Sequence, residues 1–429
     1  MMRPLLRGYG WLMWLAQPLL RRKLARRAQA EPGYGAHVPE RFGHYTQPAS
    51  SGWVWVHAVS LGETRAAAVL VAALRERLPG MRLLLTHGTA TGRAEGARLL
   101  RAGDLQVWQP WDTPGATGRF MAQFRPRIGV LMETEIWPWL IASSRRAGVP
   151  LVLANARLSP KSLRGAQRVP LLPPAYAALT AAWAQTEDDA ARLREAGAHV
   201  AGVFGNLKFD AAPDAVLLAR GRAWHTGVDR PVVMFASSRE GEEAMLMDLL
   251  AADPGLCRAL HWLIVPRHPQ RFDEVAALAA SRGLAPARRS GWTEQGPAAD
   301  ADPEAEVWLG DSLGEMALYY GLADVVLLGG SFAPLGGQNL IEAAACGRPV
   351  VLGPHTFNFA EAAQLAVAAG AARRAEDLAD AVRMARGLAG DAGALAQASQ
   401  AALDFAAAHR GAAARTADAI VGVVGEAGR

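Results

Sequence analysis

The chain has 429 residues, a formal net charge of +5 and two cysteines, so it is long enough for two domains and too poor in cysteine for a disulfide framework. Seven basic and no acidic residues fall within residues 1–30, which leaves −2 for the remainder. Because the excess positive charge belongs to one terminal segment, nucleic acid is excluded as the expected partner.

The first recognisable feature is an apolar, tryptophan-rich stretch over residues 8–20 (GYGWLMWLAQPLL), with arginines on both sides. It is shorter than the roughly 20 residues that cross a bilayer, and Pro18 interrupts it. No small-residue cleavage site of a secretory signal peptide follows it. The pattern predicts a helix that lies in the membrane interface on the cytoplasmic side, where anionic lipid attracts arginine. The alternative is a helix that docks on another protein.

Two series of apolar runs separated by helical segments follow, as in parallel sheets covered on both faces. The expected strands are Val54–Val59, Leu83–Thr86, Ile128–Met132 and Leu151–Asn155, then Val232–Ala236, Trp262–Val265, Val325–Leu328 and Val350–Leu352. The division we expect is a membrane-associated segment (1–30), a first domain (31–215) and a second domain (216–429). Residues 211–230 are expected to form the linker, and 285–306 a surface loop.

Acidic residues follow two strands of the first series. Glu63 sits in the turn Ser60-Leu61-Gly62-Glu63, where it fits equally an ordinary helix-start acid and a general base. Glu133 and Glu135 emerge from a buried strand, where carboxylates are costly unless they are used. Lys208 follows later, in the segment GNLKFD. Ligands bind at the carboxyl ends of parallel strands, so these residues are candidates for a site.

The second series ends in glycine-rich turns typical of phosphate binding. Gly329-Gly330 and Gly336-Gly337 precede a helical segment that opens on Asn339 and carries Glu342. Glycines admit a phosphate and a helix start stabilises it, whereas a carboxylate one turn later suits ribose hydroxyls, so a nucleotide is indicated. The alternative is an ordinary glycine-rich strand–helix turn.

Other strand ends add candidates, and several known motifs are absent. Arg267 is held between prolines in VPRHP, as a clamp for an anion would be, and Ser312 to Glu315 form a capping box. Neither a P-loop, an early GxGxxG, HExxH nor CxxC occurs, which disfavours P-loop and dinucleotide proteins and implies no bound metal.

Eight segments, in order, resemble those of the bacterial Kdo transferases, which move 3-deoxy-D-manno-oct-2-ulosonic acid (Kdo) from CMP-Kdo to a lipid A precursor. They are HAVSLGE, ETEIWPW, NARLSPKS, GNLKFD, ASSREGEE, VPRHPQRF, GDSLGEM and the GGS–GGQNLIEAA–GPHTFNF block. The resemblance implies the GT-B fold: two Rossmann-like, doubly wound α/β domains facing a cleft, with the membrane-associated helix in front. It also implies an inverting transferase that needs no metal or other cofactor. The acceptor would be lipid IVA, at the cytoplasmic side of the bacterial inner membrane.

The resemblance also implies residue roles. Glu63 would be the general base, and Glu133 and Lys208 would support the transition state. The residues that would bind CMP are Pro266, Arg267, Gly314, Glu315, Met316, Asn339, Leu340, Ile341 and Glu342. One departure is Gln338, where the family usually has histidine, together with Leu340 in place of proline.

Two other functions remain open from the sequence. One is a different GT-B transferase that uses a UDP-sugar on a lipid or glycan, and the other is a catalytically silent GT-B-like protein that binds membrane surfaces. The segments around Glu63 and Arg267 argue against both.

Overall fold

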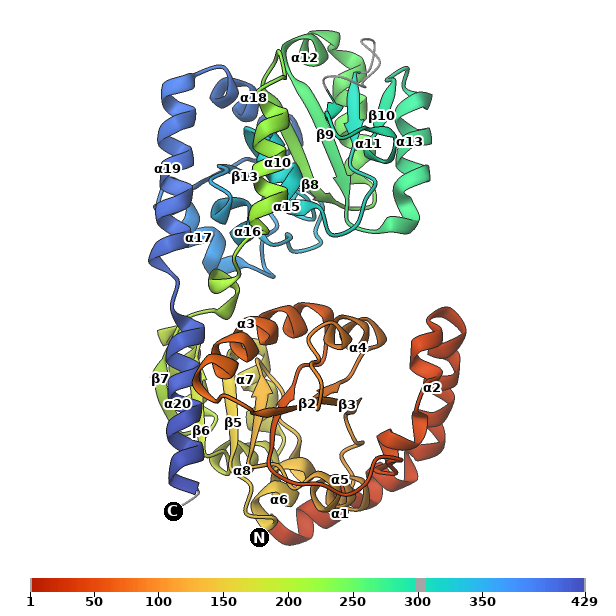
Figure 1. Cartoon of the computed structure of the whole chain (residues 1–429), viewed down its shortest axis with the longest axis vertical. Coiled ribbons are helices and arrows are strands. Elements are labelled where there is room, and N and C mark those ends of the chain that lie inside the picture. The colour runs from red at the N-terminus through yellow and green to blue at the C-terminus, as the bar shows by residue number, and fades with distance from the viewer. Residues whose placement is uncertain (1, 298–305, 428–429) are drawn as a thin grey trace. The chain divides into compact units, whose positions relative to one another are not determined.

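The computed structural model describes residues 2–297 and 306–427 (Figure 1). The chain forms two compact units. The first comprises Met1–Asp210 and Arg410–Arg429, and the second comprises Ala211–His409. Each unit is built around one seven-stranded sheet whose strand pairs are all parallel.

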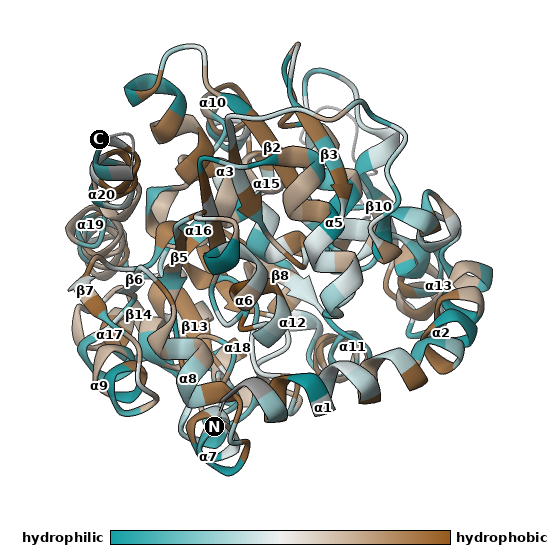
Figure 2. Cartoon of the chain, turned by 90° about the horizontal axis from the view of Figure 1, so that it is seen from below, coloured by the Kyte–Doolittle hydropathy of each residue, from teal (hydrophilic) through white to brown (hydrophobic). Residues whose placement is uncertain are grey.

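The sheet of the first unit has the strand order β3-β2-β1-β4-β5-β6-β7. Its strands are β1 (Trp53–His57), β2 (Arg82–His87), β3 (Leu105–Trp108), β4 (Ile128–Met132), β5 (Leu151–Ala156), β6 (Ala181–Ala184) and β7 (Val200–Val203). The central strands β1, β4 and β5 are buried along their whole length, as expected for a parallel sheet covered on both faces. Figure 2 shows β2 and β5 largely in hydrophobic colours.

Helices connect these strands and bury large side chains such as Trp55, Phe120 and Phe124. The helices of the first unit are α1 (Met2–Leu15), α2 (Gln17–Ala30), η1 (Pro32–Gly35), η2 (Val38–Phe42), α3 (Leu61–Arg77), α4 (Ala90–Ala97), α5 (Pro114–Phe124), α6 (Pro138–Arg146), α7 (Pro160–Arg168), α8 (Leu172–Ala177), α9 (Glu187–Glu195), η3 (Leu207–Asp210) and α20 (Ala412–Ala427).

The N-terminal segment forms two helices that meet at Ala16, two residues before Pro18. Leu6 and Leu24 are buried on the inner side, and Gly10 lies so close to Trp139 of α6 that a Cβ would come within 2.8 Å of its Nε1. The outer side exposes large apolar residues: Leu5, Trp11, Leu12, Trp14, Leu15 and Leu19. Within residues 2–297 and 306–427, no helix combines the length and the apolar character needed to cross a membrane.

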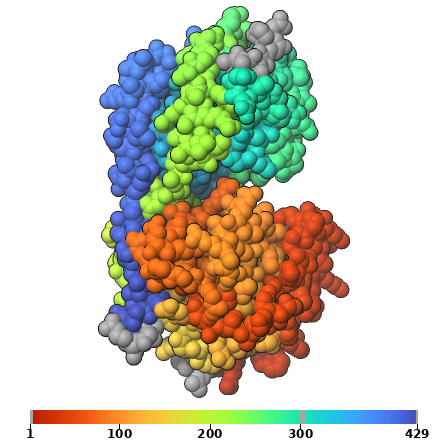
Figure 3. Space-filling view, in the orientation of Figure 1, coloured from red at the N-terminus to blue at the C-terminus, as the bar shows by residue number. Residues whose placement is uncertain are grey.

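The last helix returns to the first unit. Helix α20 lies alongside α3 (Figures 1 and 3), and the Asp210 carboxylate accepts hydrogen bonds from the backbone N–H groups of Gly411 and Ala413 at its start. The sequence-based division placed residues 216–429 in one domain. The difference arises because Ile420, a fully buried residue of α20, packs in the same apolar cluster as Leu70 and Leu74 of α3.

The sheet of the second unit has the order β10-β11-β9-β8-β12-β13-β14. Its strands are β8 (Val232–Ser238), β9 (His261–Pro266), β10 (Pro286–Arg288), β11 (Val307–Leu309), β12 (Val325–Leu328), β13 (Val350–Leu352) and β14 (Ala372–Arg374). The expectation of a loop over 285–306 was wrong for β10, which pairs with β11 at the sheet edge. Residues 298–305 of that segment lie outside the described residues.

The helices of the second unit cover both faces of its sheet. They are α10 (Ala215–His225), α11 (Glu242–Ala252), α12 (Pro254–Ala259), η4 (Pro269–Arg271), α13 (Phe272–Ser281), η5 (Arg289–Gly291), α15 (Met316–Leu322), α16 (Leu340–Ala345), α17 (Ala360–Ala368), α18 (Leu378–Ala389) and α19 (Ala392–Ala408). Most of the expected linker is helix α10, which packs on α15. A Cβ at Gly221 would lie 2.0 Å from the carbonyl oxygen of Leu318, so glycine permits this close approach.

Each sheet is doubly wound, as the sequence predicted. In the first, the chain runs outward from β1 to β3 and then returns to β4 on the other side of β1. In the second, β8 and β12 hold the equivalent positions. Loops after two such strands turn to opposite faces of the sheet, which leaves a crevice at the carboxyl ends where ligands of such folds bind.

We predict that Ile420→Ala destabilises the first unit by about 2–5 kcal/mol, because truncating a fully buried isoleucine removes apolar contacts and leaves a cavity. Urea denaturation followed by tryptophan fluorescence measures the effect. The matched control is Asp418→Ala on the same helix, which removes only a solvent-exposed ion pair with Arg77 and should have little effect on stability. Equal stability of Ile420→Ala and the control would contradict the docking of α20 on α3.

Candidate functional site

Glu63 lies in the first turn of α3, directly after β1. Ser60 is the N-cap and its hydroxyl accepts from the Glu63 backbone N–H at 3.4 Å. The Glu63 carboxylate accepts from the Val59 backbone N–H at 2.7 Å and from the Ser60 hydroxyl at 3.2 Å. Burial raises the pKa of Glu63 to about 6, against the lowering effect of the Val59 hydrogen bond. Glu63 is thus a helix-capping acid and also a carboxylate tuned toward neutral pH.

Glu133 follows β4, the strand paired with β1, so it lies across the switch point from Glu63. Its φ of 55° is uncommon for a residue other than glycine. Its backbone is held by hydrogen bonds from its N–H to the Ala154 oxygen and from the Arg157 N–H to its own oxygen. The buried carboxylate lies 3.0 Å from Arg157 Nε and 3.7 Å from Lys208 Nζ. Glu133 therefore joins two cations at the end of the sheet.

Glu135, His57 and Trp137 complete this carboxyl edge. Glu135 Oε2 accepts from Trp137 Nε1 at 2.6 Å and lies 3.7 Å from His57 Nε2. His57 is fully buried at the end of β1, with Nδ1 2.9 Å from the Thr86 hydroxyl. The negative charges of Glu133 and Glu135 also raise the pKa of Glu63. The fold thus brings both acids of the Glu133-x-Glu135 pair into the electrostatic environment of Glu63.

In the second unit, Asn339 and Glu342 form the start of α16. Asn339 is its N-cap: Oδ1 accepts from the Ile341 N–H at 3.1 Å, and Nδ2 donates to Glu342 Oε1 at 3.0 Å. Both polar side chains are half-buried, whereas Leu340 and Ile341 point into the core. Among these four candidates, only Asn339 and Glu342 have partly exposed side chains.

The remaining donor-site candidates lie after β9 and β11. Pro266 ends β9 and is buried, and the Arg267 N–H donates to the Ser238 oxygen at 2.9 Å, which fixes Arg267 beside the end of β8.

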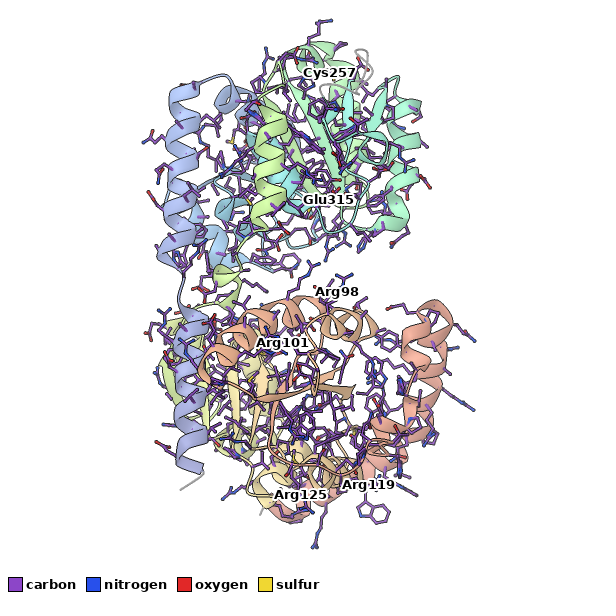
Figure 4. The ribbon with its side chains drawn as sticks, viewed as in Figure 1. Arg98, Arg101, Arg119, Arg125, Cys257 and Glu315 are labelled. Carbon is purple, nitrogen blue, oxygen red and sulfur yellow. The ribbon has the colours of Figure 1, made fainter. Side chains whose placement is uncertain are left out.

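The candidates after β11 lie in the turn before α15. Gly314 has a φ of 83°, and Met316 begins α15. Glu315 accepts from Arg289 at 2.9 Å and from the Ser312 hydroxyl at 2.5 Å. Glu315 lies at the opposite end of the unit from Cys257, which precedes β9 (Figure 4).

Glu242 is a structural residue of this site that the sequence analysis missed. It is fully buried, and its carboxylate accepts four backbone N–H groups, from Arg239, Gly330, Phe332 and Ala333, at 2.7–3.2 Å. One carboxylate therefore joins the loop after β8 to the loop after β12. The spacing of Glu242, Leu246 and Leu250, which lie on one helical face, was the signal that this acid is buried.

No group of three or more histidine, cysteine, aspartate or glutamate residues is arranged to hold a metal ion in residues 2–297 and 306–427.

The carboxyl edges of the two sheets differ in the charged side chains that they carry. The first groups carboxylates with two cations, whereas the second brings Arg239, Arg267 and Arg271 around His268, whose pKa is lowered by its burial and by these charges. The first edge suits proton transfer from a hydroxyl, and the second suits an anionic ligand.

Two Rossmann-like units in tandem are the architecture of the GT-B glycosyltransferases, and solved structures agree on this fold. HepE of Anabaena, solved in complex with UDP-glucose, aligns over 87% of this chain and 99% of its own with a TM-score of 0.57 at 14% identity. A glycosyltransferase of Rickettsia africae aligns over 89% of this chain and 99% of its own with a TM-score of 0.56 at 13% identity.

Sequence comparison identifies the family. Residues 36–211 match the family described as 3-deoxy-D-manno-octulosonic-acid transferase (kdotransferase). The chain is 50% identical, over 97% of both sequences, to the 3-deoxy-D-manno-octulosonic acid transferase of Bordetella pertussis. It is 32% identical, over 88% of both, to that of Haemophilus influenzae. The chain belongs to the Kdo transferase family, which confirms the resemblance that the eight segments indicated.

We predict that Glu133→Gln lowers the pKa of Glu63 below about 6, because the negative charge of Glu133 is one of the causes that raise it. A pH titration followed by carboxyl ¹³C NMR measures this value. Glu76→Gln, which removes an exposed carboxylate at the other end of α3, is the control and leaves the pKa unchanged. An unchanged pKa in Glu133→Gln would show that the two carboxylates do not interact.

Proposed function

We propose that the protein transfers Kdo from CMP-Kdo to a hydroxyl group of a lipid A precursor, lipid IVA, with inversion at the anomeric carbon. Membership of the Kdo transferase family indicates that Kdo is the transferred sugar. The observation that carries the mechanism is the position and pKa of Glu63. This carboxylate lies at the switch point of the first sheet, with a pKa raised to about 6. A base of this kind is ionised at neutral pH and still has useful affinity for a proton.

In the proposed step, Glu63 takes the proton of the acceptor hydroxyl as the acceptor oxygen forms a bond to the anomeric carbon of Kdo. The bond between that carbon and the phosphate oxygen breaks, and CMP leaves with the electron pair. A single displacement of this kind inverts the anomeric configuration. The two hydrogen bonds from Val59 and Ser60 hold the carboxylate in position, so little reorganisation accompanies proton transfer.

Glu133 and Lys208 are assigned to support of the transition state. Lys208 Nζ lies 3.7 Å from the Glu133 carboxylate, and Arg157 Nε lies 3.0 Å from it. Glu133 therefore keeps two positive charges at the edge where the acceptor would react. These cations would stabilise negative charge that develops during transfer. Because Glu133 is held at a positive φ by flanking backbone hydrogen bonds, its orientation is set by the fold rather than by the substrate.

Donor binding is assigned to the carboxyl edge of the second sheet. Arg267 would bind the CMP phosphate, next to Pro266 and to the turn formed by Gly314, Glu315 and Met316. Asn339, Leu340, Ile341 and Glu342 would complete the nucleotide site. Glu342 would accept from the ribose hydroxyls, since an ionised carboxylate can accept several hydrogen bonds in addition to the one from Asn339. These residues act without a metal ion in the proposed mechanism.

The exposed apolar side of α1 and α2 supports a location at the cytoplasmic face of the inner membrane. Trp11 and Trp14 are 67% and 56% exposed, and arginines and a lysine flank them along α2. Figure 2 shows hydrophobic and hydrophilic residues on these helices. Tryptophan and basic residues favour the headgroup region of an anionic bilayer, where the lipid acceptor would be found.

Glu63→Gln tests the reaction and its base together. The assay combines the purified protein, CMP-Kdo generated in situ and a tetraacyl lipid A precursor, with mass spectrometry of the lipid. We expect a mass increase of one or more Kdo units with the wild type and a loss of about 10²–10⁴-fold in kcat for the variant, the usual contribution of a general base. Glu76→Gln serves as the control and keeps full activity.

The pH dependence adds a second check on Glu63. The rate of the wild type should fall as the pH drops through about 6, because protonation removes the base. Near wild-type rates in Glu63→Gln would exclude this residue as the base. The proposed donor would be contradicted if the lipid stayed unmodified with CMP-Kdo but gained a sugar when a UDP-sugar was supplied.

Membrane binding can be tested with Trp11→Ser/Trp14→Ser. Liposome co-sedimentation on vesicles containing phosphatidylglycerol should show at least about tenfold weaker binding, because two interfacial aromatic anchors are lost. The control Val216→Ser changes an apolar residue that is 71% exposed on α10 and should bind as the wild type does. Undiminished binding of the double variant would contradict the role of this helix.

A further inference from the structure

Two polar side chains that have no role in the mechanism above converge on Gly330 in the second unit. Arg239 follows β8, and Gly330 follows β12, the two strands at the switch point of this sheet. A Cβ placed on Gly330 would lie 3.0 Å from Gln338 Nε2 and 3.6 Å from Arg239 Cγ. Gly330 also has a φ of 71°, which favours glycine. The absence of a side chain at Gly330 therefore lets the Arg239 and Gln338 side chains approach the same point of the backbone.

The backbone of Arg239 and of Gly330 is fixed by one buried group, the Glu242 carboxylate. Glu242 accepts from the Arg239 N–H at 2.9 Å and from the Gly330 N–H at 2.7 Å. The Gln338 N–H donates to the Gly329 oxygen at 3.1 Å. This hydrogen bond joins the two ends of the loop between β12 and α16. These hydrogen bonds hold the backbone of Arg239, Gly330 and Gln338 in place, and a specific binding site needs a fixed backbone of this kind.

Arg239 and Arg267 bring two positive charges to the loops after β8 and β9, where Glu240 and the buried Glu242 are the nearby carboxylates. Arg239 and Arg267 both act on half-buried His268, whose pKa is lowered by burial first and then by these neighbouring cations. Arg271 pairs with Glu243 and Glu274, whereas Glu240 opposes the effect of the arginines on the pKa of His268. Within the described residues, the buried Nε of Arg239 has no hydrogen-bond partner. A buried guanidinium N–H without a partner is costly, and an anionic ligand would satisfy it.

We propose that Arg239, together with Gln338, binds the carboxylate of the donor sugar and so selects an acidic sugar over a neutral hexose. The guanidinium is planar and presents paired N–H groups that match a carboxylate, and the Gln338 amide adds a further donor. The proposal rests on the proposed function, since it takes a nucleotide-linked ulosonic acid as the donor. Arg267 remains the residue assigned to the phosphate.

The test compares Arg239→Met and Arg239→Lys with the wild type, using two ligands. KM for CMP-Kdo reports on the whole donor, whereas the inhibition constant of CMP reports only on the nucleotide and its phosphate. We expect Arg239→Met to raise KM for CMP-Kdo by about 10- to 100-fold, the usual loss for a charged hydrogen bond. The inhibition constant of CMP should stay within about twofold, and Arg239→Lys should recover part of the loss because its charge remains.

Arg282→Met is the matched control, since its side chain pairs with Asp248 on the surface of the same unit and should leave both constants unchanged. A parallel rise of KM and of the CMP inhibition constant would place Arg239 on the phosphate and overturn the proposal. Unchanged constants, or a lower melting temperature as the only effect, would also overturn it. Failure of the wild type to use CMP-Kdo would instead refute the proposed function, so the two failures are distinguishable.

Discussion

The constraint on which both sites depend is the reversal of strand order in a parallel sheet. At β1 and β4, and again at β8 and β12, neighbouring strands send their following loops to opposite faces of the sheet. In folds of this kind, ligand-binding side chains from several strands gather at the carboxyl ends of the strands. Glu63 and Glu133 occupy one such place, and Arg239 and Gly330 occupy the other.

Buried carboxylates hold these edges in shape. Glu242 accepts four backbone N–H groups and thereby ties two loops together, while Glu133 is placed at a positive φ between Arg157 and Lys208. Such groups are stable in the interior only because every charge meets donors or opposite charges. The arrangement separates two kinds of chemistry: an acidic edge suited to accept a proton and a basic edge suited to hold an anion.

Much of the fold could be predicted from the sequence, because buried parallel strands are continuous apolar runs. Val54, Ile128 and Val325 lie in strands that were recognised on this basis. The strands that escaped notice are short or carry few apolar residues, such as β10 with Pro286-Ala287-Arg288 and β14 with Ala372-Arg373-Arg374. They form by pairing with a neighbouring strand, which local composition does not reveal.

The sequence by itself determined the class of fold, the family and the chemical types at each strand end, since these follow from local patterns and motifs. Only the tertiary structure decided which of these groups meet. It brought Glu135 and His57 toward Glu63, placed α20 on α3 of the first unit, and set Arg239 beside Gln338, 99 positions along the chain. Contacts of this kind depend on strand order and on backbone hydrogen bonds between distant loops. The spacing of residues along the chain predicts neither of these.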